Sequence, residues 1–305
     1  MSIETIPLFG LGTWRSEPNE VGNAVKEALK IGYNHIDCAH IYQNESEIGE
    51  AFKSSFNSGI NRNDIWVTSK LWNDSHRPEH VKSALKHTLS NLKLDHLDLY
   101  LIHWPIAFKH GITFPSIKDE YELIENIPIS ETWQALEECV KEGLTRQLGV
   151  ANFTINKLKP LIKNSEIKPT VNQVELHPYL AQNDLKDFAD ENGVILTAYS
   201  PLGAPHLERN VDMIKIMEDD IVVSIAKEKD LSPAQVLIAW AINRGTSVIP
   251  KSSNPGRLKQ NLEASYIELS KTEMEQLNSL DKGLRYIDGT FFTTKSPYTT
   301  EYLWG

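Results

Sequence analysis

The sequence has few cysteines and no long apolar segment. Its 305 residues include only two cysteines, Cys38 and Cys139, which lie far apart and form no Cys-x-x-Cys pair. This argues against a disulfide framework and favours a reducing setting inside the cell. The N-terminus lacks a basic region followed by an apolar core, and no apolar run approaches the roughly 20 residues of a membrane span. We therefore expect a cytoplasmic protein with no membrane partner.

Positive charge is also scarce. The chain has 31 Lys and Arg against 41 Asp and Glu, which gives a formal net charge of −10, and no long basic run is present. Nucleic acid is therefore not expected as a partner, although a local basic pocket for one phosphate is compatible with this balance. No extra association element is visible, so we expect a monomer.

The sequence offers little for a metal ion. His76 and His80 lie four residues apart, a spacing that can place two ligands on one helix face. Pro78 between them indicates the start of a helix instead, and no third ligand is evident. We expect no metal site.

What the sequence does contain is a regular alternation of short apolar runs and amphipathic segments. Stretches with apolar residues at helical spacing separate eight such runs, which indicates βαβ units and a parallel sheet. Eight units in about 300 residues predict a closed (β/α)8 TIM barrel. A Rossmann sheet would need a Gly-x-Gly-x-x-Gly turn, which is absent because Thr13 and Trp14 follow Gly12. The predicted strands are residues 7–11, 35–37, 65–70, 97–103, 147–151, 171–175, 195–199 and 247–249, and the predicted helices include residues 21–31, 45–56, 81–92, 132–141, 185–191, 234–244 and 255–264.

Three segments are longer than a barrel requires. They are residues 106–130, 203–219 and the tail 281–305. Connections of this length in a compact domain are usually functional, so we expect long loops at the C-terminal rim of the barrel. The tail is too rich in aromatic residues for a disordered terminus. We expect a single barrel domain over residues 1–305, in which the tail closes the substrate pocket.

Polar residues end or follow six of the predicted strands, and the strand 171–175 carries Gln173 within it. Buried parallel strands are normally apolar, so a polar residue at such a position needs a partner or a function. In a parallel barrel these positions meet at the C-terminal rim, where barrel enzymes hold their active sites. The residues are Asp37, Lys70, His103, Asn152, Gln173, Tyr199 with Ser200, and Lys251 with Ser252.

Four residues of this rim suit proton chemistry at one oxygen atom. A buried Lys70 needs a counter-ion, which Asp37 on the neighbouring strand can supply. A cation beside Tyr42 favours the phenolate and should lower a pKa that starts near about 10, so that Tyr42 exchanges a proton near neutral pH. His103 can donate a hydrogen bond to the same oxygen. The expected chemistry is proton transfer at a carbonyl or an alcohol.

Six motifs make the chain resemble the aldo-keto reductase superfamily, and its aldose and aldehyde reductases in particular. The resemblance runs in order from residue 10 to about residue 262, nearly the whole barrel. It implies a barrel that binds NADP(H) in extended form, and a tetrad of Asp37, Tyr42, Lys70 and His103 in which Tyr42 is the general acid. The motifs are GLGTW at 10–14, DCAHIYQNE at 37–45, LIHWP at 101–105, GVANF at 149–153, NQVELHP at 172–178 and IPKS at 249–252.

The same resemblance implies a set of cofactor contacts. Asn152 and Gln173 would hold the nicotinamide carboxamide, and Tyr199 would stack on the ring. Lys251 and Arg257, at the start of a helix, would bind the 2′-phosphate of NADPH, which favours NADPH over NADH. The full set comprises Thr13, Trp14, Asp37, Asn152, Gln173, Tyr199, the pyrophosphate contacts Ser200, Leu202 and Gly203, the phosphate pocket Lys251, Ser252 and Arg257, and Gln260 and Asn261 near the adenine.

The predicted substrate pocket is apolar and aromatic. Its walls would be Trp14, Trp72 and Trp104 beside His103, each tryptophan directly following a strand end, with Phe108 as a further candidate. The tail residues Phe291, Phe292 and Leu303 would close the pocket and set its selectivity.

Two positions depart from the family pattern. Ala151 stands where relatives commonly have a serine, which removes one hydrogen bond to the carboxamide, about 1 kcal/mol. His206 stands where some relatives have an acid that latches over the pyrophosphate, and Glu208 reaching Arg15 would partly restore the latch. We expect a weaker latch and faster cofactor exchange.

Three functions are compatible with these residues. The leading one is NADPH-dependent reduction of small-molecule aldehydes, with ketones or open-chain sugars as further substrates. A second is a cofactor-sensing regulatory subunit of the same fold. A third is a barrel aldolase or isomerase with Lys70 as a Schiff base.

Overall fold

Eight parallel strands form the central sheet, in the order β1-β2-β3-β4-β7-β8-β9-β10. The computed structural model describes residues 4–123, 125–204 and 215–305. Parallel bridges from Phe9 to Val248 and from Gly12 to Lys251 join the first strand to the last, which closes the (β/α)8 barrel. The strands are β1 Leu11–Gly12, β2 His35–Asp37, β3 Trp66–Leu71, β4 Leu97–Ile102, β7 Thr145–Ala151, β8 Val171–Glu175, β9 Ile195–Tyr199 and β10 Ser247–Val248.

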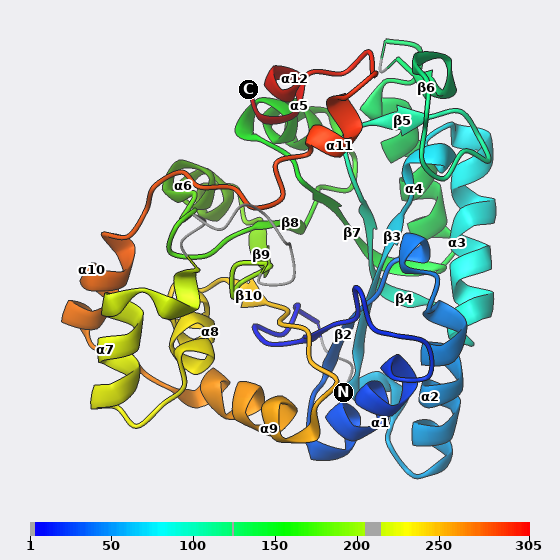
Figure 1. Cartoon of the computed structure of the whole chain (residues 1–305). Coiled ribbons are helices and arrows are strands. Elements are labelled where there is room, and N and C mark those ends of the chain that lie inside the picture. The colour runs from blue at the N-terminus through cyan, green and yellow to red at the C-terminus, as the bar shows by residue number, and fades with distance from the viewer. Residues whose placement is uncertain (1–3, 124, 205–214) are drawn as a thin grey trace.

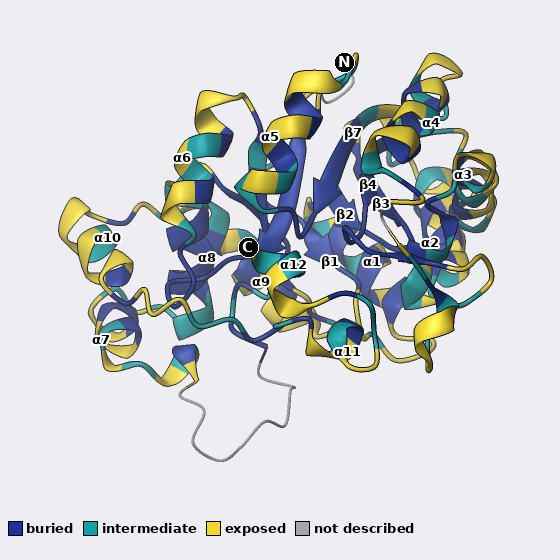
Figure 2. Ribbon diagram, turned by 90° about the horizontal axis from the view of Figure 1, so that it is seen from above, coloured by how far each residue is buried: buried dark blue, intermediate teal, exposed yellow. Residues whose placement is uncertain are grey.

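Helices surround the barrel (Figure 1). Figure 2 shows the strands buried at the centre, while the outward faces of the helices are exposed. Helix α8 is buried along most of its length, which fits its almost continuous apolar sequence. The helices are α1 Val21–Ile31, α2 Glu45–Asn57, α3 Pro78–Leu92, α4 Ile129–Lys141, α5 Ile155–Asn164, α6 Asn183–Glu191, α7 Asp220–Glu228, α8 Pro233–Asn243, α9 Pro255–Glu263, α10 Lys271–Asn278, α11 Thr290–Thr293 and α12 Thr300–Trp304.

The predicted barrel is confirmed, with differences at the element ends. The first predicted strand, 7–11, is wrong in its bounds, because the ladder with β2 pairs only Leu11 and Gly12. Strand β7 begins two residues before the predicted 147–151, since Thr145 already pairs with Leu97 of β4. Helix α7 directly follows the long segment 203–219 and was not predicted.

The long connection after β4 and the C-terminal tail lie side by side at the rim. Strands β5 (Ala107–Phe108) and β6 (Tyr121–Glu122) form a small antiparallel hairpin within that connection. The Ala107 amide donates to the Tyr298 hydroxyl at 3.2 Å, and the Tyr302 hydroxyl donates to the Pro105 carbonyl at 3.0 Å. The tail, orange to red in Figure 1, runs along the rim of the barrel, and these hydrogen bonds hold it there.

Within the described ranges, no helix combines the length and the apolarity needed to cross a membrane.

Candidate active site

A cavity of about 1340 Å³ opens at the C-terminal ends of the strands. Strand ends, the loops that follow them, the start of α9 and the C-terminal tail all contribute to its walls. The predicted site residues that line it are Thr13, Trp14, Asp37, Tyr42, Trp72, His103, Trp104, Asn152, Gln173, Tyr199, Ser200, Leu202, Gly203, Lys251, Ser252, Arg257, Gln260 and Asn261.

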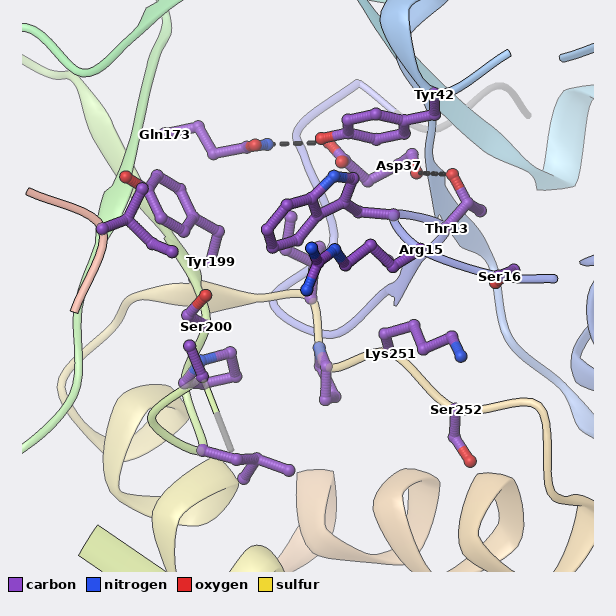
Figure 3. Close-up of a pocket in the computed structure, with 18 of the residues that line it drawn as sticks. Thr13, Arg15, Ser16, Asp37, Tyr42, Gln173, Tyr199, Ser200, Lys251 and Ser252 are labelled. Carbon is purple, nitrogen blue, oxygen red and sulfur yellow. Dashed lines mark hydrogen bonds between the residues drawn. The ribbon is translucent and has the colours of Figure 1, made fainter. Parts of the chain in front are cut away.

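Lys70 lies behind this cavity, at the centre of a hydrogen-bond network. Its side chain is fully buried, and Nζ donates to Asp37 Oδ1 at 2.5 Å, to the Cys38 carbonyl at 2.8 Å and to the Tyr42 hydroxyl at 3.4 Å. The other Asp37 oxygen accepts from Gln173 Nε2 at 2.7 Å (Figure 3). Asp37 and Gln173 therefore fix the ammonium against the phenol oxygen of Tyr42.

The pair with Asp37 keeps Lys70 charged. Burial opposes the ammonium, but the charge of Asp37 and the contact with Tyr42 outweigh it, so that the pKa of Lys70 is raised. Since the chain keeps this charge in a fully buried position, the carboxylate must remain beside it.

Tyr42 differs from what the sequence predicted. Burial raises the pKa of Tyr42 to about 12, because it exceeds the opposing effect of the Lys70 charge. The expectation that Lys70 brings this pKa toward neutrality is therefore wrong in its net result, although Lys70 does act in the expected direction. At neutral pH Tyr42 is a phenol, which can give a proton but does not accept one.

His103 is neutral and lies beside Tyr42. Burial, followed by the nearby Lys70 and His76, holds the pKa of His103 well below its usual value. Its ring is 5.9 Å from the Tyr42 ring and 5.1 Å from the Trp72 ring, both edge-on. A neutral imidazole in the cavity wall can donate one hydrogen bond without adding charge.

The amides predicted to hold a carboxamide already have protein partners. Asn152, in the left-handed region at φ 64°, donates from Nδ2 to the His103 carbonyl at 3.0 Å. Its Oδ1 accepts from the Tyr199 hydroxyl at 2.7 Å. Gln173 uses its NH2 group on Asp37, as described above. The two amides and Tyr199 thus form one connected wall next to the tetrad, and the side chain of Ala151 adds no hydrogen bond to it.

The opposite end of the cavity is basic. Lys251 and Arg257 are exposed, and neither forms an ion pair with a described carboxylate. Asn254 caps α9 by accepting from the Arg257 amide at 3.0 Å, and Ser252 lies beside this cap. Two cations near the N-terminus of a helix suit an anionic group.

Gly203, which lines the cavity, occupies a position that only glycine fits. Its φ is +64°, and a Cβ there would lie 2.8 Å from Ile216 and 2.9 Å from the Tyr286 ring. Ile216 and Tyr286 therefore fill the space beside the buried Gly203, which explains why this position is a glycine. The two cations at the basic end suit a ligand that carries phosphate.

Comparison with known proteins decides the family. The model of the Aldo/keto reductase family matches residues 8–282. An aldo/keto reductase of Synechocystis sp. is 48% identical over 306 residues, covering 99% of this chain and 94% of the relative. Aldo-keto reductase family 1 member A1 of Mus musculus is 46% identical over 288 residues, covering 93% of this chain and 89% of the relative.

The chain belongs to the aldo/keto reductase family. Two solved structures agree with this assignment. The aldose reductase of Schistosoma japonicum superimposes with a TM-score of 0.87 at 40% identity, covering 95% of this chain and 93% of that one. The aldose reductase of Giardia lamblia gives a TM-score of 0.88 at 40% identity, covering 95% of this chain and 97% of that one. This aldo/keto reductase is accordingly an oxidoreductase for carbonyl groups of small molecules, in a family that generally uses nicotinamide cofactors.

The end of the cavity away from the basic residues is an aromatic enclosure. Trp72 and Trp104 line the cavity with Phe291 and Phe292 of the tail, and the Phe292 ring lies 5.1 Å from that of Trp104. Ile41, Phe114 and Ile287 also line it and were not predicted. Ile41 and Ile287 could have been suspected from their positions beside Tyr42 and in the tail. Phe114, in an irregular loop, carries no sequence pattern that marks it.

Phe108 and Leu303 are not part of the cavity wall, contrary to expectation. Phe108 is buried behind Trp72, with ring centroids 5.9 Å apart. Leu303 is buried in α12, where it packs near Gly289. Phe108 of β5 thus supports Trp72 from behind, and Leu303 packs where the tail folds back toward Gly289.

Two further expectations concern the latch over the pyrophosphate and the histidine pair. His206 and Glu208 of the proposed latch lie outside the described residues; Arg15 lines the cavity with its guanidinium 5.1 Å from the Trp14 ring. His80 stacks on His110 at 3.6 Å, while His76 is buried. The ranges described contain no cluster of three potential metal ligands.

We predict that Lys70 and Asp37 depend on each other for stability. Lys70→Met leaves a buried carboxylate without its counter-ion and should lower the free energy of unfolding by about 3–5 kcal/mol. The double variant Asp37→Asn with Lys70→Met removes both charges and should recover at least half of this loss. Urea unfolding of the wild type, the two single variants and the double variant measures the coupling energy between the two residues. If the double variant lost the sum of the two single losses, the prediction would be contradicted.

Proposed function

We propose that this chain reduces aldehydes to alcohols with NADPH, and that ketones and open-chain aldoses are further substrates. The observation that carries the proposal is the position of Tyr42. Its half-buried phenol lines the cavity beside His103 and has a buried ammonium 3.4 Å from its oxygen. Burial around the phenol raises its pKa to about 12, so that it carries its proton at neutral pH.

The tetrad supports proton donation to a carbonyl oxygen. When bound, NADPH supplies a hydride from C4 of its nicotinamide to the carbonyl carbon. Tyr42 donates the proton to the oxygen, and His103 donates a hydrogen bond that orients it. At the 3.4 Å between Lys70 Nζ and the Tyr42 oxygen, an ammonium and a phenolate attract by about 5 kcal/mol at an effective dielectric constant of about 20. Lys70 thus stabilises the phenolate that remains, and Asp37 holds Lys70 in place.

The cofactor preference follows from the basic end of the cavity. Lys251 and Arg257 carry charge suited to the 2′-phosphate that distinguishes NADPH from NADH, with Ser252 as a neutral hydrogen-bonding group. Gln260 and Asn261 on the same helix would face the adenine, and Ser200, Leu202 and Gly203 would follow the pyrophosphate. Thr13, Trp14, Asn152, Gln173 and Tyr199, which line the same cavity, would enclose the nicotinamide.

The other two functions receive less support. A Schiff base at Lys70 requires a neutral, accessible amine, whereas this amine is fully buried with three hydrogen-bond acceptors around it. A cofactor-sensing regulatory subunit does not need the assembled tetrad or the aromatic enclosure. The cytoplasm as the location and a monomeric state stay predictions.

Replacing Tyr42 by Phe should abolish nearly all turnover with a panel of small aldehydes, because the proton donor is lost while the ring remains. Loss of NADPH absorbance measures the rate. Tyr266→Phe, at an exposed tyrosine, is the matched control and should leave the rate unchanged. Substantial activity in the Tyr42 variant would falsify the assignment of Tyr42 as the acid.

Arg257→Ala should weaken NADPH binding by about ten- to a hundredfold and leave NADH binding nearly unchanged, since a charged hydrogen bond to phosphate is worth about 1.5–3 kcal/mol. Quenching of tryptophan fluorescence measures both dissociation constants. Lys259→Ala removes another exposed cation of α9 and serves as the control. Equal losses for the two cofactors would contradict the phosphate assignment.

A further inference from the structure

A buried carboxylate outside the tetrad holds the start of the C-terminal tail. Glu175, the last residue of β8, is fully buried. Its Oε1 accepts from the Tyr286 amide and its Oε2 from the Ile287 amide, both at 2.7 Å. A ring nitrogen of His177 lies 2.9 Å from Oε1. One carboxylate thus binds two consecutive main-chain amides that follow it by more than a hundred residues.

We propose that Glu175 is a positioning residue that sets the substrate wall of the cavity through these two amides. The inference rests on the proposed reductase function, because its kinetic consequence concerns aldehyde substrates. Two amides held by the two oxygens of one carboxylate fix both the place and the direction of the peptide. Glu175 touches neither the tetrad nor the predicted phosphate pocket in the described structure, so its effect is carried by the tail.

The segment held by Glu175 leads directly into the wall. Ile287 itself lines the cavity, and Phe291 and Phe292 follow in α11. The ring of Phe292 packs at 5.1 Å from that of Trp104 and at 6.1 Å from that of Trp72. A shift of the peptide at Ile287 would therefore move three residues of the aromatic enclosure together.

The same segment also packs against the cofactor side. Tyr286 occupies the space that a side chain at Gly203 would need, with 2.9 Å between its ring and the position of a Cβ. Glu175 is paired in register with Tyr199 of β9. Glu175 therefore connects two parts of the molecule. On one side are the ends of β8 and β9, which carry Gln173 and Tyr199, and on the other side is the tail.

The distal part of the tail has anchors of its own. The hydroxyl of Tyr302 donates to the Pro105 carbonyl at 3.0 Å, and Lys157 Nζ donates to the Leu303 carbonyl at 3.3 Å. Loss of the Glu175 contacts should therefore loosen residues around 286–292 while the end of the chain stays docked. This predicts a change in substrate selectivity rather than a general loss of structure.

Glu175→Gln is the test. A glutamine keeps one acceptor oxygen and turns an NH2 group toward a second amide N–H, so that one of the two contacts must break. Glu137→Gln is the matched control, because Glu137 is also buried and also accepts from a backbone amide, that of Ile167 at 2.9 Å, but lies on α4 away from the cavity. Glu175→Asp, which keeps the charge on a shorter side chain, is a second variant with the same expected direction if the glutamine variant does not fold.

Hydrogen exchange and kinetics give the two readouts on the full chain. In the Glu175 variant the peptide that contains the amides of residues 286 and 287 should exchange at least about tenfold faster, the equivalent of one lost hydrogen bond. KM for a two-ring aromatic aldehyde should rise about tenfold, while KM and kcat for propanal stay within about twofold. The Glu137 variant should match the wild type in every measurement.

Unchanged protection of these amides would overturn the proposal. So would faster exchange without a change in the ratio of the two KM values, or an equal loss of kcat on both aldehydes. If the wild type reduced no aldehyde, the proposed function would fail by itself. The exchange experiment would still show whether Glu175 holds the tail.

Discussion

The buried pair of Lys70 and Asp37 is the constraint on which the rest of the site depends. A fully buried ammonium is stable only beside a carboxylate, and Asp37 in turn needs the Gln173 amide for its second oxygen. Asp37 of β2, Lys70 of β3 and Gln173 of β8 must therefore lie at the same height in the barrel. Once they do, Tyr42 is fixed against the ammonium, and its proton can leave toward the cavity without creating an isolated buried charge.

The cavity has a polar, charged end and an aromatic end. Different parts of the chain form the two ends. Strand ends and α9 supply the basic end, whereas a hairpin loop and the C-terminal tail supply much of the aromatic end. The barrel can thus keep its proton chemistry while the tail changes shape. Glu175 lies where the two parts meet, which is why a residue on a barrel strand can act on substrate selectivity.

The barrel and much of the candidate site could be predicted, because the parallel strands of a barrel bring their ends together. Asp37, Lys70 and His103 could therefore be grouped from the sequence alone. The pKa of Tyr42 could not, because it depends on how completely distant segments bury the phenol. Phe108, in the connection after β4, and Leu303, in the tail, lie in segments that have no periodic pattern. Glu175 gave no signal, since its partners are backbone amides, the nearer one 111 residues later.

The central claim is that burial keeps Tyr42 protonated despite the adjacent Lys70, so that it serves as an acid. The most direct test is a pH titration of the protein with 13C-labelled tyrosine Cζ, followed by NMR, with Tyr42→Phe to assign the signal. With a pKa raised to about 12, the Tyr42 signal should remain that of a phenol up to about pH 10. A phenolate signal that grows below about pH 8 would contradict the account.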